Sequence, residues 1–212
     1  MRSFRLSAAL LVVSALSADA PLSTVLKSVE ARYNHAKTLQ VLFTEQYTPK
    51  GGIQRSESGT LQLRKPGRMR WDYLQPVKGK LVISDNTFLY LYNPIEKRAM
   101  KTKLKDSMAD DMQAPLAFLL GKLNFDKEFK NLQASPDGGD LRITGEPKNA
   151  NLPYSSVDFV VTPQNQIRKL RITLPEYTLE FVFTMEKMDP PLDAKLFDFQ
   201  LPAGAQWDEA AR

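Results

Sequence analysis

The spacing of apolar residues changes along the chain. Between residues 22 and 37 they recur every three or four positions, which is typical of an amphipathic helix: Val25, Leu26, Val29, Tyr33 and Ala36. From residue 39 the period becomes two, which predicts a strand with one side formed by Leu39, Val41, Phe43, Glu45 and Tyr47.

Strand-like runs then follow one another with short breaks. The first group covers residues 58–64, 68–73, 80–84, 87–92 and a weakly alternating 96–103. The second group covers residues 140–145, 155–162, 166–174 and 177–188. Asp85-Asn86 and Asn93-Pro94 are turn pairs between runs. Sequential strands joined by short turns predict an antiparallel meander, and a sheet of this length tends to curl toward a barrel.

The middle of the chain has a helical pattern instead. Residues 106–123 are rich in methionine, leucine and phenylalanine, with Pro115 near a helix start and Gly121 near an end. Residues 125–132 are expected to add a further turn of helix. The pattern therefore predicts an α+β fold with a leading helix, about six strands, a helical insertion and about four more strands.

Several strands are apolar on both faces, at residues 81–83, 88–92 and 159–161. A sheet with one wet face alternates more regularly. The excess apolar surface indicates either a thick core under the helices or a lined cavity, and periodicity does not separate the two.

The first twenty residues have the three parts of a secretory signal peptide. Arg2 and Arg5 precede an apolar run at residues 6–16, and small residues end at Ala20. The run is too short for a permanent membrane span. Cleavage after Ala20 or after Ser17 fits the pattern. We expect an exported soluble protein with one domain at residues 21–212.

The amino-acid composition excludes several kinds of site and partner. The 212 residues include no cysteine, which excludes disulfides, thiolate nucleophiles and a lipidated N-terminal cysteine. The 29 Lys and Arg residues outnumber the 24 Asp and Glu residues, but the basic residues are spread over strand ends. This spread does not favour a nucleic-acid partner. It fits solvated strand edges, or docking to an acidic partner or an anionic membrane.

Catalytic patterns are also missing. The single histidine, His35, has no nucleophile-elbow serine to serve, and the sequence contains no H-E-x-x-H and no phosphate-binding glycine loop. Asp72, Asp85 and the pair Asp110-Asp111 have ordinary solvated or capping roles as their simpler interpretation. We therefore expect no enzyme activity, no cofactor and no metal site, although a hydrolase with paired carboxylates stays an alternative.

One stretch carries a resemblance to a known family. Residues 64–73 read R-K-P-G-R-M-R-W-D-Y, followed by Pro76, by V-I-S-D at 82–85 and by L-Y-N-P at 91–94. In this order they resemble the LolA family of periplasmic lipoprotein carriers. The similarity extends to residues 115–120 and to the tail at 193–202, and so covers nearly all of the chain after residue 20.

The resemblance implies an incomplete, half-open antiparallel β-barrel in which the N-terminal helix and the central helical insertion form a lid over a hydrophobic cavity. Such a carrier takes lipoprotein acyl chains from an inner-membrane lipoprotein-releasing ABC transporter, passes them to an outer-membrane acceptor and hydrolyses nothing. We expect a monomer in the periplasm. The wider superfamily also contains glycolipid carriers and envelope-stress sensors that bind a partner protein, and these remain alternatives.

The cavity lining follows from the apolar positions. From the sheet we expect Val41, Phe43, Leu61, Leu63, Met69, Trp71, Leu81, Ile83, Leu89, Leu91, Phe181 and Phe183. From the helices we expect Val29, Tyr33, Met112, Leu116, Phe118 and Leu119. Some of these can equally be ordinary core beneath the helices.

The family's lid latch is commonly an arginine directly before the proline of the motif. Here that position is Lys65, with Arg64 one residue earlier. A shift of one residue in a strand reverses the face, so Arg64 is a doubtful substitute. Lys65 can donate a hydrogen bond but lacks the planar fork of arginine. Which of the two latches the lid is left open.

Overall fold

A computed structural model describes residues 21–103 and 123–208. The expected signal peptide and most of the expected helical insertion, including Met112, Leu116, Phe118 and Leu119, lie outside the described residues. The described elements are α1 (Leu22–His35), β1 (Thr38–Pro49), β2 (Arg55–Arg64), β3 (Arg68–Gln75), β4 (Leu81–Asp85), β5 (Phe88–Asn93), β6 (Arg98–Lys103), α4 (Phe125–Glu128), β7 (Phe129–Asp137), β8 (Asp140–Pro147), β9 (Ser156–Val161), β10 (Ile167–Thr173), β11 (Tyr177–Met188), a 3-10 helix (Ala194–Phe197) and β12 (Gln206–Trp207).

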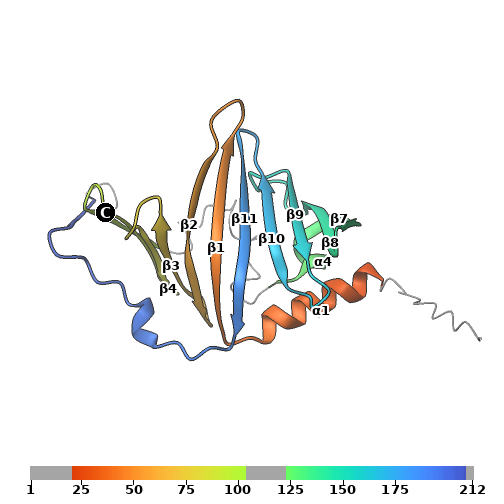
Figure 1. The fold of residues 1–212 in the computed structure, drawn as a ribbon, viewed down its shortest axis with the longest axis horizontal. Helices are drawn as coiled ribbons and strands as arrows, with labels where there is room; N and C mark the ends of the chain where they lie inside the picture. The colour runs from red at the N-terminus through yellow and green to blue at the C-terminus, as the bar shows by residue number, and fades with distance from the viewer. Residues whose placement is uncertain (1–20, 104–122, 209–212) are drawn as a thin grey trace, which may run out of the picture.

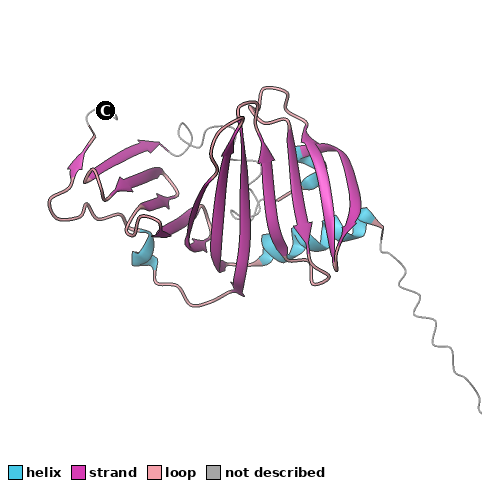
Figure 2. Cartoon of the chain, turned by 45° about the horizontal axis from the view of Figure 1, so that its top comes forward, coloured by secondary structure: helices cyan, strands magenta, loops and turns pink. Residues whose placement is uncertain are grey.

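The strands form one sheet in the order β12-β6-β5-β4-β3-β2-β1-β11-β10-β9-β8-β7. All neighbours are antiparallel except β12, which runs parallel to β6. The two edge strands, β12 and β7, lie at opposite ends of the sheet, so the sheet stays open (Figure 1). This confirms the expected α+β fold with an unclosed antiparallel sheet. Helix α1 crosses the lower part of the β8–β11 half (Figure 2).

The sheet has an inner face, defined as the face that packs against α1. Along β1 the buried residues are Leu39, Val41 and Phe43, as the period of two predicts. Phe43 lies opposite Gly59 on β2, where an added Cβ would come within 3.0 Å of the Phe43 ring and 2.0 Å of a backbone oxygen on β3. A side chain at Gly59 would therefore clash with the neighbouring strand, and glycine is what allows this close approach.

The expectation of helix over residues 125–132 is wrong beyond residue 128. Helix α4 stops at Glu128, and Phe129 begins the edge strand β7, which pairs with β8. The register shifts between Lys130 and Gln133, where Asn131 has a φ of 54°. This bulge, on a strand exposed along most of its length, breaks the alternation that would have marked it as a strand.

The last turn of α1 is fastened to the sheet by hydrogen bonds. The Lys65 Nζ donates to the carbonyl oxygens of Tyr33 (2.8 Å) and Asn34 (2.6 Å). The Tyr33 hydroxyl donates to Glu186 on β11 (2.7 Å) and accepts from the Ile167 amide on β10 (2.8 Å). Because a helix leaves its last carbonyls unpaired, a lysine at this end both satisfies them and complements the helix dipole.

The side chains of Asn34 and Glu30 hold the segment that leads into α4. Asn34 donates to the Leu123 carbonyl (2.7 Å) and accepts from the Leu123 amide (2.9 Å). The buried Glu30 carboxylate accepts from the Phe125 amide (2.8 Å). Helix α1 thus joins the β2–β3 turn, β10, β11 and the start of α4.

The C-terminal tail covers the outer face of β3–β5. Arg64 donates to the Leu192 carbonyl (2.9 Å) and Arg70 to the Leu196 carbonyl (3.0 Å). Phe197 is buried, and the ring of Phe199 stacks on Tyr90 at 5.0 Å. The two residues that the sequence offered as a latch therefore have different partners: Arg64 holds the tail and Lys65 holds α1.

We expect the two substitutions Lys65→Ala and Arg64→Ala to loosen different parts of the fold. Lys65→Ala removes two charge-assisted hydrogen bonds from a partly exposed side chain, so it should cost about 1 kcal/mol and lower amide hydrogen-exchange protection in the last turn of α1. Arg64→Ala is the matched control and should lower protection in residues 190–197 instead. Equal loss of α1 protection in both variants would contradict this division.

Candidate ligand-binding face

Strand register aligns apolar side chains across the inner face from β1 to β6. Opposed residues of antiparallel strands share a face, and the pairings carry one row through six strands: Val41, Leu61, Trp71, Val82, Leu91 and Met100. On the other side of β1 a second row runs through Phe181, Leu170, Phe159 and Ile143. The inner face is therefore apolar from β6 to β8.

Aromatic rings form the centre of this face. The Phe43 ring lies 4.8 Å from that of Trp71 and 5.1 Å from that of Tyr73, both edge to face. Trp71 is 5.9 Å from Phe181, which stacks parallel to Phe183 at 6.1 Å. Such pairs are favourable beyond the area they bury, so the rings hold one another in fixed orientations.

The inner face brings together most of the residues predicted as lining. Those from the sheet are Val41, Phe43, Leu61, Leu63, Met69, Trp71, Leu89, Leu91, Phe181 and Phe183. Val29 and Tyr33 of α1 belong to the same cluster.

Two predicted lining residues lie on the opposite face. Ile83 pairs with Arg70, and Leu81 pairs with Asp72, so both point outward. Ile83 is only 1% exposed because the C-terminal tail covers this part of the outer face. Strand β4 is apolar on both sides, so its sequence could not indicate which side faces inward. Val82, which sequence reasoning missed, takes the inner position.

Polar side chains gather where the inner face reaches the β1–β2 and β3–β4 turns. The Tyr73 hydroxyl donates to the Glu45 carboxylate (3.0 Å). Beside them, Lys80 pairs with Glu57 (2.5 Å) and lies 4.1 Å over the Tyr73 ring. Burial against the apolar face raises the pKa of the Glu45 carboxyl. An acid that is easier to protonate than usual thus borders the apolar surface.

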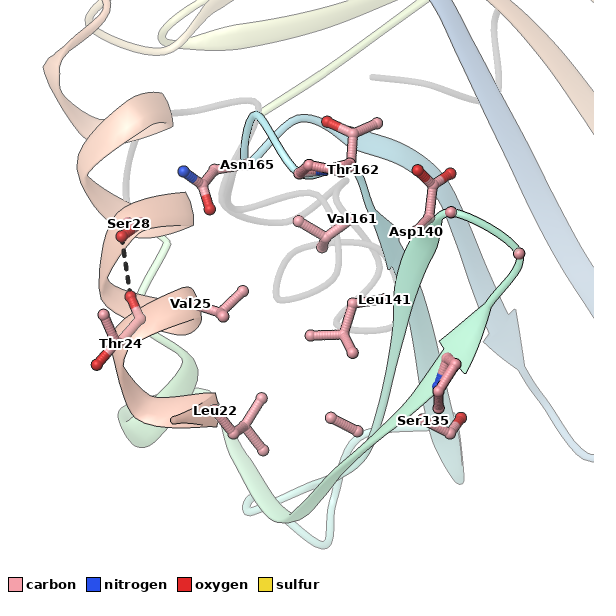
Figure 3. A pocket seen from close by; sticks show the side chains of 15 residues that line it. Leu22, Thr24, Val25, Ser28, Ser135, Asp140, Leu141, Val161, Thr162 and Asn165 are labelled. Atoms are coloured by element: carbon pink, nitrogen blue, oxygen red, sulfur yellow. Dashed lines mark hydrogen bonds between the residues drawn. The ribbon is translucent and has the colours of Figure 1, made fainter. Parts of the chain in front are cut away.

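A pocket of about 700 Å³ opens between α1, the strands β7 to β9 and the β9–β10 turn (Figure 3). Leu22 and Val25 of α1 face Leu141 and Val161, which are opposed residues on the inner face. The pocket lies within the usual size range of small-molecule sites.

Polar groups stand around this apolar centre: Thr24, Ser28, Ser135, Asp140, Thr162 and Asn165. Sequence reasoning did not select Leu141 or Val161 as site residues. Leu141 alternates with Ile143, and Val161 with Phe159, at a period of two, and this pattern could have identified them as inward-facing residues.

The described residues offer an apolar binding surface. Among residues 21–103 and 123–208 there is no group of three or more His, Cys, Asp or Glu side chains placed to hold a metal. His35 is exposed at the end of α1. In the same part of the chain, no helix has the length and apolarity needed to cross a membrane.

Comparison with known proteins places the fold in a family. The family model described as outer membrane lipoprotein carrier protein LolA matches residues 34–200. A protein of Proteus mirabilis (strain HI4320), described as an outer-membrane lipoprotein carrier protein, is 28% identical over 186 residues, or 86% of this chain and 87% of its own. A protein of Bordetella avium (strain 197N) with the same description is 27% identical over 157 residues, covering 74% and 73%.

Among solved structures, the chain resembles an uncharacterized conserved protein from Thermus thermophilus. The TM-score is 0.54 at 10% sequence identity, covering 88% of this chain and 97% of that one, which is a likeness of fold. The family match spans the sheet from β1 to β11 together with the covering tail. The chain belongs to the LolA family of outer membrane lipoprotein carrier proteins.

Proposed function

We propose that this protein is a periplasmic carrier that holds the acyl chains of lipoproteins against its inner face. The observation that carries the proposal is the unbroken apolar row from Val41 to Met100 in a sheet that does not close. Each exposed methylene costs about 0.8 kcal/mol in water, so a long acyl chain needs an apolar surface to cross an aqueous compartment. The names of the relatives from Proteus mirabilis and Bordetella avium support lipoprotein as the cargo.

The carrier function also implies a route for the lipoprotein between the two membranes. The chain would be exported by its first twenty residues, receive lipoprotein from an inner-membrane lipoprotein-releasing ABC transporter, and give it to an outer-membrane acceptor while remaining a monomer. Binding and release, without bond cleavage, are sufficient for this role. Release then depends on modest affinity, and adaptable side chains such as Met69 and Met100 on the inner face suit loose packing.

Native mass spectrometry of the protein purified from periplasm tests the proposal directly. We expect a fraction of the protein to carry an acyl-bearing ligand, and added lipoprotein to raise that fraction. Repeated absence of any acyl-bearing ligand, together with no uptake of added lipoprotein, would overturn the carrier function.

The two faces of the sheet give a pair of leucine variants. Leu91 points inward, whereas Leu42 on β1 points outward and lies outside the pocket that Leu91 lines. Leu91→Ser should weaken binding of a fluorescent acyl probe by roughly three- to tenfold, because it removes apolar contact area. Leu42→Ser should leave the dissociation constant within about twofold. Equal weakening by both variants would show that the chain does not bind along this row.

Glu45 should make acyl binding depend on pH. The raised pKa means that the carboxyl becomes neutral at a higher pH than an ordinary glutamate, and a neutral group opposes a nearby acyl chain less. Affinity for the acyl probe should therefore rise as pH falls from neutral toward mildly acid values. Glu45→Gln should bind more tightly at neutral pH and lose most of this pH dependence; an unchanged pH profile in Glu45→Gln would exclude Glu45 as its source.

A further inference from the structure

Two isoleucines are strongly exposed at turn tips at one end of the sheet. Ile53, between β1 and β2, is 87% exposed, and Ile95, between β5 and β6, is 72% exposed. Because β1 to β6 form an antiparallel meander, the β1–β2, β3–β4 and β5–β6 turns share one end, the upper end in Figure 1. We call these three turns, residues 50–54, 76–80 and 94–97, the rim. A single exposed aliphatic side chain is common on protein surfaces, but two on turns of the same edge identify that edge as a candidate interaction surface.

The rim is also basic. Within the rim the only acidic residue in the sequence is Glu96, and the basic ones are Lys50, Lys78, Lys80 and Lys97; Arg55 and Arg98 follow the first and third turns directly. Lys80 is paired with Glu57 on β2. A surface of this sign attracts anionic lipid headgroups, an attraction that salt screens.

The rim is continuous with the inner face. A pocket of about 370 Å³ is lined by Val77 and Ile95 from the rim and by Val82 and Leu91 from the inner face. Apolar side chains therefore lead from the Ile95 tip to the row of side chains on which we place the acyl chains, with charged side chains such as Glu57 and Arg98 at the border of the pocket. A cargo chain passing over this part of the rim would meet apolar contacts on its way to the inner face.

We propose that the rim docks on an anionic lipid bilayer, with Ile53 and Ile95 entering its interfacial layer. The passage of acyl chains over the rim rests on the proposed carrier function, whereas the docking itself does not. A lipid surface fits better than a protein partner because the two aliphatic tips are on turns separated by the β3–β4 turn. Separate tips can each enter a fluid interface, while a protein interface requires a contiguous apolar core.

Vesicle co-sedimentation tests the docking. The exported chain, with its N-terminus determined by mass spectrometry, is mixed with vesicles of equal parts phosphatidylglycerol and phosphatidylcholine, or of phosphatidylcholine alone. We expect binding to the anionic vesicles that weakens with added salt, and little binding to the neutral ones. The double variant Ile53→Ser/Ile95→Ser should bind the anionic vesicles roughly tenfold more weakly. Met185→Ser, which removes a 69% exposed side chain from β11 outside the rim, is the control and should bind as the wild type does.

The possible results separate the docking from the carrier function. Failure of the wild-type protein to bind anionic vesicles, or unchanged binding by the double isoleucine variant, would overturn the docking, and a protein partner would then be the remaining explanation of the rim. Acyl-probe uptake measured without vesicles should be the same in the single variant Ile53→Ser, which changes no residue of the 370 Å³ pocket, and in the wild type. If the wild type binds anionic vesicles but takes up no acyl probe, the carrier function alone is overturned.

Discussion

The organisation of this protein depends on how the last turn of α1 is held. An open sheet with an apolar inner face must have that face covered, or its exposed area would favour aggregation. Within the described residues α1 and α4 both cover the β8–β11 half, with Phe125 of α4 packed against Phe159 of β9. Hydrogen bonds with Lys65, Glu186, Ile167 and Leu123 hold the last turn of α1. These bonds involve the backbone carbonyls or the side chains of Tyr33 and Asn34. The helix is thus fixed most firmly at one end, beside the β2–β3 turn.

The fold could be predicted from sequence to the extent that side chains alternate. The alternation in β1, β2 and β3 located both these strands and their inward positions, because each has one apolar and one polar side. Strand β7 was missed since it is a bulged edge strand with few buried residues. The faces of β4 were assigned wrongly because the C-terminal tail, distant in sequence, buries its outer side.

The candidate site shows the same limit. The apolar character of the site follows from the local pattern of each strand, but the roles of Arg64 and Lys65 do not. Arg64 binds a carbonyl more than a hundred residues away in the tail, and Lys65 binds carbonyls in the last turn of α1. The pocket beneath α1 is likewise made by bringing Leu22 and Val25 to Leu141 and Val161. The spacing of residues within one strand does not indicate such a contact between distant segments. The family resemblance supplied the half-open sheet, which the periodicity alone could not separate from a closed one.

The positions of α1 and the tail have a mechanical consequence. Helix α1 braces the inner side of the β8–β11 half, while the tail braces the outer side of β3–β5. Strands β1 and β2 lie between these two braces, and the tail holds them at their Thr38 and Arg64 ends. A sheet stiffened on opposite sides at its two ends is most compliant in the middle, so we expect it to adapt to a bound chain by bending across the other ends of β1 and β2. Gly59, which lets two strands approach closely, is where we expect this bending to begin.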